Sequence, residues 1–145
     1  MSEYDHFLQW WSRVSELWEI DFIAAHELVQ PEKGIPPMEL WPNILPTAWI
    51  VNSLRDYYGE PVRITSAYRS PQYNAEVGGS VQSRHIHFNA LDFQFDNVSP
   101  EIVQDELRSD GTLKLGIGLG VYETFTHLDT RAFVFPWMSP QEWTG

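Results

Sequence analysis

Apolar residues near the start of the chain recur with the period of an α-helix. Between residues 4 and 19 they are spaced one or three positions apart, which places them on one face of an amphipathic helix. A second, short helical stretch is expected over residues 21–29. Prolines then rule out a regular helix through residues 30–46, which we expect to form a loop packed onto the body. Residues 47–58 again fit a helix, and Gly59 is well suited to end it. The apolar face of the first helix would carry Phe7, Leu8, Trp11, Val14, Leu17 and Trp18.

After residue 60 the pattern changes to the two-residue period of a β-strand. Val62 and Ile64 alternate with polar neighbours and predict a strand. Residues 68–79 contain turn-forming residues throughout and are expected to form a loop. Residues 90–96 alternate between apolar and polar positions, which on a strand turns Asp92 away from the buried face. That buried face would carry Leu91, Phe93 and Phe95.

Helix signals return at residue 99. Ser99 is a favourable N-cap and Pro100 fits the first helical position, so a helix is expected to start there and to run to about residue 109. Gly111 would end it. The chain therefore passes from helices to strands, through one more helix, to its last segment.

The last segment predicts a strand pair over residues 113–122 and 125–134, followed by coil over 136–145. The glycines of residues 116–120 resemble a phosphate-binding loop, but no helix pattern follows them, so a tight turn is expected there. This order of elements predicts an α+β fold in which a small, mostly antiparallel sheet is flanked by helices.

Length and composition indicate one globular domain. The chain has 145 residues, of which 43% are hydrophobic, so it can bury a core. We expect a single domain over residues 1–145, with N-terminal helices in 1–60 and the chemistry-bearing core in 61–135. Nine basic and 20 acidic residues give a net charge of −11. This charge argues against nucleic acid and against an anionic membrane surface as partners.

Cysteine is absent from the chain. Disulfides, thiolate metal sites and a cysteine nucleophile are therefore excluded. The N-terminus shows no signal-peptide pattern, so synthesis in the cytoplasm is expected. A substrate in the cell wall would then have to be reached by phage-type lysis or another export route. The oligomeric state is unknown from sequence, and a monomer is assumed.

Two histidines and one carboxylate suggest metal chemistry. His85, Asp92 and His127 come from separate segments and could supply the three protein ligands of a catalytic zinc ion, with the fourth position open to water. Such a water is a nucleophile at neutral pH, so hydrolysis is the expected chemistry. His85 would lie in the loop before the strand that holds Asp92. His127 and Asp129 are two residues apart and would share one face of a strand.

Several motifs, taken in order, resemble the family of zinc D-Ala-D-Ala peptidases, and more narrowly its carboxypeptidase-like branch. The motifs are Ser66-Ala-Tyr-Arg-Ser-Pro-Gln-Tyr-Asn74, Gly78-Gly79, Ser83-x-His85, Ala90-x-Asp92, Gly118-x-Gly-Val-Tyr122 and Phe125-x-His-x-Asp129-x-Arg131. The resemblance implies the small sheet shared with the hedgehog signalling domain, with zinc held by His85, Asp92 and His127. It also implies that Arg69 holds substrate and stabilises the oxyanion, a role that suits a fixed guanidinium near a metal.

The chain departs from the family pattern at the general base. Many members carry an acidic residue three positions before the last histidine ligand, where this chain has Thr124. Asp129 is therefore the candidate base, although it would serve equally to orient a ligand. Glu123 is the other candidate, and a hedgehog-like register would make Asp129 the ligand and Glu123 the acid. Phe88 replaces a common glycine and is expected to add bulk near the site.

The leading hypothesis is a zinc peptidase that hydrolyses peptide bonds of peptidoglycan stem peptides or of their precursors. D,D-carboxypeptidase, endopeptidase and cytosolic D-Ala-D-Ala dipeptidase activities all remain open. A rival reading is a non-catalytic binding or virion component that kept the fold and lost the base. A third is a metal-free α+β domain. Two histidines and one carboxylate would also suit iron or manganese.

Overall fold

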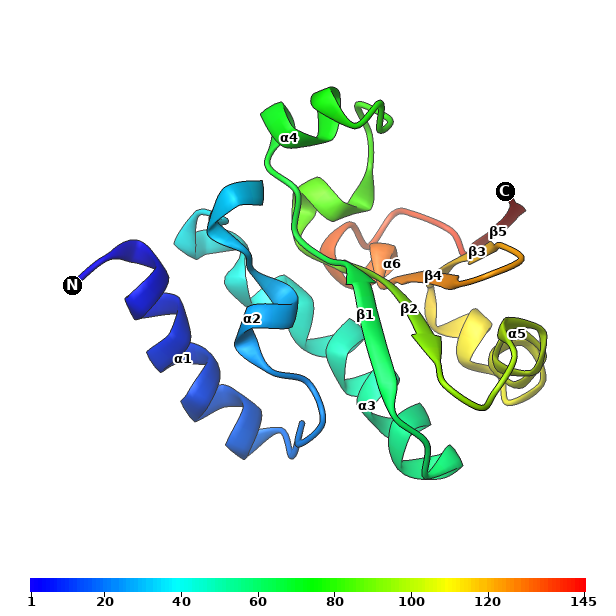
Figure 1. Cartoon of the computed structure of the whole chain (residues 1–145). Helices are drawn as coiled ribbons and strands as arrows, with labels where there is room; N and C mark the ends of the chain where they lie inside the picture. Colours follow the sequence, from blue (N-terminus) through cyan, green and yellow to red (C-terminus); the bar gives the residue numbers. More distant parts are fainter.

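The computed structural model describes residues 1–145 and has an α+β architecture (Figure 1). Its five strands form one sheet in the order β1–β2–β4–β3–β5. Neighbouring strands run antiparallel except β3 and β5, which run parallel. The predicted fold class and the mostly antiparallel sheet are confirmed. The strands are β1 (Val62–Ser66), β2 (Ala90–Phe95), β3 (Gly118–Val121), β4 (Thr126–Asp129) and β5 (Gln141–Thr144).

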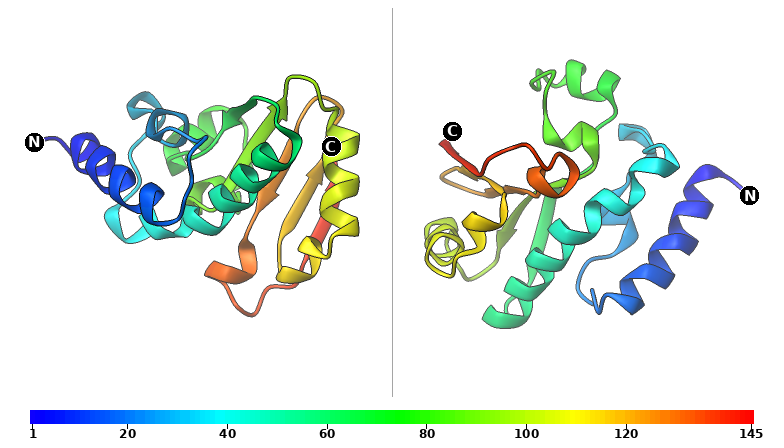
Figure 2. Two further views of the ribbon diagram at one scale, coloured as in Figure 1. Left: turned by 90° about the horizontal axis from the view of Figure 1, so that it is seen from below. Right: turned by 180° about the vertical axis from the view of Figure 1, so that it is seen from behind.

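Helices pack around this sheet in positions that two further views make clear (Figure 2). Helix α3 contacts β2, helix α5 contacts β3 and β4, and α1 lies farther out against α2. Short 3-10 turns cover 31–33, 38–43, 84–87 and 112–115. The helices are α1 (Glu3–Leu17), α2 (Ala25–Leu28), α3 (Ile44–Tyr58), α4 (Pro71–Glu76), α5 (Pro100–Ser109) and α6 (Arg131–Val134).

The two faces of the sheet differ in character. Leu91, Leu119 and Leu128 point to one face and are completely buried in the hydrophobic core. Because side chains alternate along a strand, Asp92 and His127 point to the opposite face. The core therefore holds the strands in place from one side, while the other side carries polar side chains.

Helix α3 begins earlier than the proline pattern predicts. It starts at Ile44, inside the segment expected to be a loop, because Pro46 falls in the first helical turn, where its missing N–H needs no partner. The predicted end is confirmed. Gly59 takes a left-handed conformation with φ 67°, and its N–H donates to the carbonyl of Arg55.

A short helix was missed between β1 and β2. Residues 68–79 are not a continuous loop, because Pro71–Glu76 forms α4. Ser70 caps it by accepting a hydrogen bond from the Tyr73 N–H, and Pro71 occupies the first helical turn. These are the same signals that correctly predict the start of α5 at Ser99 and Pro100.

The C-terminal third differs most from the prediction. The expected strands over 113–122 and 125–134 are each reduced to four residues, and Arg131–Val134 is helical. The glycine-rich segment turns at Gly116, which has φ 88°, and then enters β3. The prediction of coil for the tail is wrong at residues 141–144, which form β5. This strand is mostly exposed, so its composition carries no strand signal, and its pairing with β3 is set by tertiary contact.

Phe88 belongs to the core rather than to the site, which corrects the expectation that it adds bulk there. Its side chain is completely buried and packs edge-to-face against Phe7 and Tyr68, with ring centroids 5.9 and 5.7 Å away. Its backbone is left-handed, with φ 55° and ψ 42°. Glycine would adopt this conformation without strain, whereas a residue with a Cβ adopts it rarely.

Candidate metal centre

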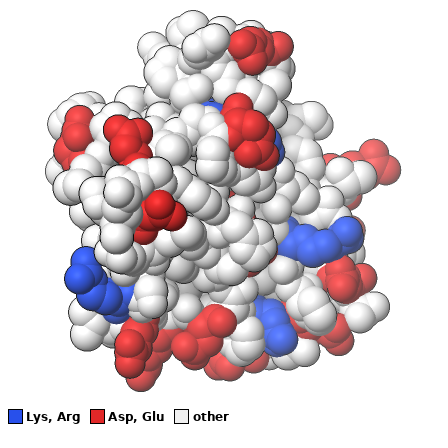
Figure 3. Space-filling model, turned by 60° about the vertical axis from the view of Figure 1, so that its left-hand side comes forward, with Lys and Arg blue, Asp and Glu red and all other residues white.

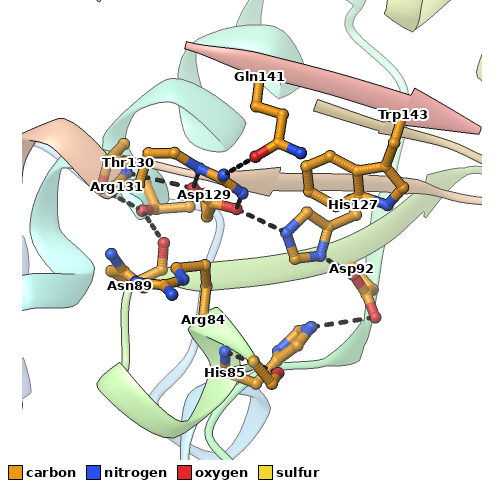
Figure 4. Close-up of polar contacts among 12 residues, drawn as sticks. Arg84, His85, Asn89, Asp92, His127, Asp129, Thr130, Arg131, Gln141 and Trp143 are labelled. Atoms are coloured by element: carbon orange, nitrogen blue, oxygen red, sulfur yellow. Dashed lines mark hydrogen bonds and ion pairs between the residues drawn. The ribbon is translucent and has the colours of Figure 1, made fainter. Parts of the chain in front are cut away.

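The antiparallel pairing of β2 and β4 brings two predicted ligands together. Asp92 lies directly opposite His127 in the register, so both side chains emerge from the same face. His85 comes from the 3-10 turn that precedes β2 (Figure 4). Ligand atoms of these three residues lie within 4.8 Å of one another, and all three residues are buried. The structure thus brings together the set expected from the sequence.

Hydrogen bonds fix which nitrogen each histidine presents. His85 Nδ1 lies 2.7 Å from the Ala67 carbonyl oxygen and donates to it, so that Nε2 faces Asp92 Oδ2 at 3.3 Å. His127 Nδ1 lies 2.8 Å from Asp92 Oδ1, and its Nε2 lies 2.9 Å from Asp129 Oδ2. One nitrogen of each ring is therefore held by a protein acceptor while the other faces Asp92. This is the arrangement of histidine ligands in metal sites.

Electrostatics keep the central carboxylate ionised. Burial alone would raise the pKa of Asp92, but hydrogen bonds from His127 and His85 and the charge of both rings hold it well below its usual range. Burial would lower the pKa of His127, whereas its hydrogen bonds to Asp129 and Asp92 raise it. The donor set of two imidazoles and one carboxylate fits a divalent metal such as zinc.

Asp129 lies behind His127, outside the space between the ligands. It is completely buried, and both of its oxygens are occupied. Oδ1 accepts from Arg131 N at 3.2 Å and Nε at 2.9 Å, while Oδ2 accepts from Arg131 Nη2 at 2.9 Å and from His127. Burial would raise the pKa of Asp129, but His127 and Arg131 hold it at about 2. The geometry favours a role in holding His127 in place; its role as general base stays a prediction.

Arg69 is fixed beside Asp92. Its Nε donates to Ser66 Oγ at 3.2 Å, its Nη1 donates to Asn74 Oδ1 at 3.4 Å, and its Nη2 lies 4.0 Å from Asp92 Oδ2. Asn74 is itself buried and held by the Ser80 carbonyl oxygen. The predicted arginine therefore stands at the site with its guanidinium already oriented.

Arg69 and the three candidate ligands line one open cleft of about 570 Å³. Three arginines contribute to its wall, and Asp92 is the acidic residue among its lining. Glu123 and Thr124 are exposed at the end of β3 and do not line it. The lining of the cleft thus carries more basic than acidic side chains, in a chain whose net charge is −11.

Comparison with known families gives a direct match to this region. A family model described as Peptidase M15 matches residues 24–129. This chain belongs to the peptidase M15 family. The match confirms the resemblance to zinc D-Ala-D-Ala peptidases, and with the His-Asp-His group it supports a metal-dependent peptidase. A comparison with curated proteins finds no match.

The M15 match includes Arg69, the three candidate ligands and Asp129 but ends before the residues that support them from β5. Arg131 Nη1 donates to Gln141 Oε1 at 2.6 Å. The Trp143 ring lies 5.0 Å from the His127 ring and 5.2 Å from the Arg131 guanidinium. Sequence reasoning missed Gln141 and Trp143 because the segment was read as coil. Arg131 belongs to the last motif, but the motif alone assigns it no role.

Two glycines of β3 make this support possible. A Cβ on Gly118 would collide with the Arg131 guanidinium and the Asp129 carboxylate. A Cβ on Gly120 would meet His127 Cβ at 2.9 Å and the Trp143 ring at 3.0 Å. The glycine-rich segment of this M15 peptidase therefore serves close packing beneath the site.

Other sequence features lie apart from the centre. His87 packs edge-on against Phe135 at 5.1 Å and is not part of the ligand group. Burial and the nearby Arg84 lower the pKa of His87. None of the helices combines the length and the apolar character that crossing a membrane requires.

Proposed function

We propose that this M15 peptidase is a zinc-dependent enzyme that hydrolyses peptide bonds of peptidoglycan stem peptides or of their precursors. The observation that carries the proposal is the group of His85, Asp92 and His127, with both imidazoles oriented by protein acceptors, in an open cleft beside Arg69. His85 Nε2, His127 Nδ1 and the Asp92 carboxylate would hold the metal. Zinc bound there would supply a water that is nucleophilic at neutral pH and would polarise the scissile carbonyl.

Arg69 is proposed to stabilise the negative charge that develops on the substrate carbonyl oxygen. Ser66 and Asn74 restrain two of its nitrogens, and the third faces the Asp92 side of the ligand group. A donor that is oriented before the reaction stabilises charge without reorganising during it. This favours Arg69 as an oxyanion group over a purely structural role.

Asp129 is proposed to act through His127 rather than on substrate. Its carboxylate holds the Nε2–H of His127, so the ring presents Nδ1 toward Asp92. A general base must reach the reacting water directly or through one other water, and complete burial argues against Asp129 in that role. We therefore regard Asp129 as a positioning residue.

The test is hydrolysis of a stem pentapeptide that ends in D-Ala-D-Ala by zinc-loaded protein, followed by mass spectrometry. Loss of one D-Ala indicates carboxypeptidase activity, and an internal cut indicates endopeptidase activity. Free D-Ala-D-Ala offered alone tests the dipeptidase alternative. His85→Ala should abolish each activity. Absence of cleavage of every substrate by zinc-loaded wild type would contradict the proposal.

A second candidate function is substrate binding without catalysis. It is favoured by one observation, namely that Thr124 replaces the usual acidic residue and that Glu123 is exposed away from the cleft. A binding protein would hold the pentapeptide in the presence of zinc and release it uncut. The mass-spectrometric assay separates the two functions directly.

A further inference from the structure

Arg84 is a cleft-lining cation without an acidic partner. It is partly buried, its Nη1 contacts Met138 Sδ at 3.6 Å, and its guanidinium lies 5.4 Å from the centre of the Phe135 ring. A thioether is only a weak acceptor, so most of the five N–H donors of Arg84 have no strong partner. The other arginines of the cleft differ, because Arg131 is paired with Asp129 at 2.9 Å and Arg69 lies 4.0 Å from Asp92.

Arg84 and Arg69 contact different parts of the cleft wall, Arg84 beside Met138 and Phe135 and Arg69 beside Asp92. Arg84 precedes His85 directly, and in Figure 4 its side chain lies on the Asp129 side of the two histidines, away from Asp92. Arg69, by contrast, lies next to Asp92. A peptide whose scissile carbonyl sits at the ligand group and meets Arg69 would therefore extend a neighbouring group toward Arg84.

The charge of the surroundings makes an anion the fitting occupant. More acidic than basic side chains are seen on the face shown in Figure 3, whereas the cleft wall carries three arginines and Asp92 as its acidic residue. A partly desolvated guanidinium without a counter-charge is unfavourable, and a carboxylate can accept two parallel N–H bonds from it. The same field would attract an anionic peptide to the cleft.

We propose that Arg84 binds a carboxylate of the peptide substrate next to the scissile bond and thereby sets the specificity of the enzyme. This inference rests on the proposed peptidase function and adds the residue that selects the substrate. The carboxylate has two possible sources, the C-terminus of the peptide or an acidic group within it. Both offer the same planar acceptor to the guanidinium fork.

Four peptides distinguish these sources. They combine a C-terminal acid or amide with an acidic or an amidated side chain next to the cleavage position, and kcat/KM is measured with zinc-loaded protein. Wild type should prefer the peptide that carries the recognised carboxylate at least 10-fold, mainly through KM. Arg84→Gln should lose about 10-fold on that peptide and retain its rate on the neutral analogue.

Controls separate recognition from structure. Arg84→Lys keeps the charge without the fork and should retain part of the preference, while Arg63→Gln removes one exposed cation elsewhere and should behave as wild type. If Arg84→Gln had a normal zinc content and lost kcat/KM equally on charged and neutral peptides, the proposal would be overturned. An unchanged preference would also overturn it.

A binding measurement keeps the inference testable if no peptide is cleaved. N-acetyl-D-alanine and its amide are titrated into zinc-loaded wild type and Arg84→Gln by NMR. The variant should bind the acid about 10-fold more weakly and the amide equally well. Equal affinity of both proteins for the acid would refute the role of Arg84, whereas absence of cleavage alone would refute only the peptidase function.

Discussion

His127 donates its Nε2–H to Asp129, two residues later on β4, at an N···O distance of 2.9 Å. The other nitrogen of the ring then faces Asp92 at 2.8 Å. One strand thus supplies both a candidate metal ligand and the carboxylate that orients it. The Asp129 carboxylate is held in turn by Arg131, so the orientation of His127 depends on a chain of buried contacts.

Replacing Asp129 by asparagine should weaken zinc binding by about 10- to 100-fold, because the carboxylate that orients His127 is lost. Zinc affinity is measured by competition with a chromogenic chelator. Glu123→Gln provides the control and should bind zinc as wild type does, since Glu123 is exposed outside the cleft. Normal zinc affinity in Asp129→Asn combined with lost peptide hydrolysis would instead identify Asp129 as the general base.

Gly118→Ala on β3 should also disturb the Arg131–Asp129 pair that holds His127. The added methyl group would collide with the Arg131–Asp129 pair, and overpacking of this kind costs about 1–3 kcal/mol. We expect a lower midpoint in urea unfolding together with weaker zinc binding. Gly59→Ala is a useful control, because it strains a left-handed residue with open space around it and should lower stability without changing zinc affinity. Equal zinc affinity in both variants would contradict the packing role of Gly118.

Phe88 offers a test of backbone strain. Substitution by alanine should cost about 3–5 kcal/mol through lost core packing. Substitution by glycine should be less destabilising by about 1 kcal/mol, because Phe88 has φ 55° and glycine relieves that strain. The same pair at Phe7, within α1, should show the usual order, with alanine more stable than glycine. The free energy of unfolding of the four variants is measured in urea. A higher stability of Phe88→Ala than of Phe88→Gly would contradict backbone strain at residue 88.

Tyr58 should limit stability at alkaline pH. Its buried hydroxyl has no protein partner, and burial, with Glu106 nearby, raises the pKa of Tyr58 to about 12. The ordinary value is about 10. Between these values the unfolded chain loses a proton that the folded chain keeps, so stability falls as pH rises from about 10 to 12.

Tyr58→Phe should remove that decline and raise stability at neutral pH by about 1 kcal/mol, because an unpartnered buried hydroxyl is removed. Tyr57→Phe is the matched control, since Tyr57 is 69% exposed. Thermal unfolding at pH 7 and at pH 11 measures both effects. If the two variants behaved alike, the hydroxyl of Tyr58 would have no such role.

The sequence predicted the parts of this protein that local pattern determines. Helix α5 follows from Ser99 and Pro100, the end of α3 from Gly59, and the alternation of β2 from its aromatic residues. The candidate ligands followed from residue type together with ordered motifs. Their grouping in space then follows from the register that places Asp92 opposite His127.

The features that the sequence pattern does not predict depend on contacts between segments far apart in the chain. β5 is mostly exposed and pairs in parallel with β3, so no periodicity marks it. Trp143 reaches His127 only through that pairing. The burial of Asp129 is likewise decided by Arg131 and the close approach of Gly118, neither of which can be read from spacing. The residues that hold His127 and Asp129 in place are therefore identified from the order of the strands in the sheet.

Bound metal is the measurement that tests the central claim most directly. Wild type and His85→Ala are prepared in parallel, equilibrated with zinc, desalted and assayed by elemental analysis. We predict about one zinc ion per wild-type chain and almost none in the variant, with both proteins folded by circular dichroism. Wild type that takes up no zinc, or a variant that retains it fully, would contradict the assignment of His85, Asp92 and His127 as a metal centre.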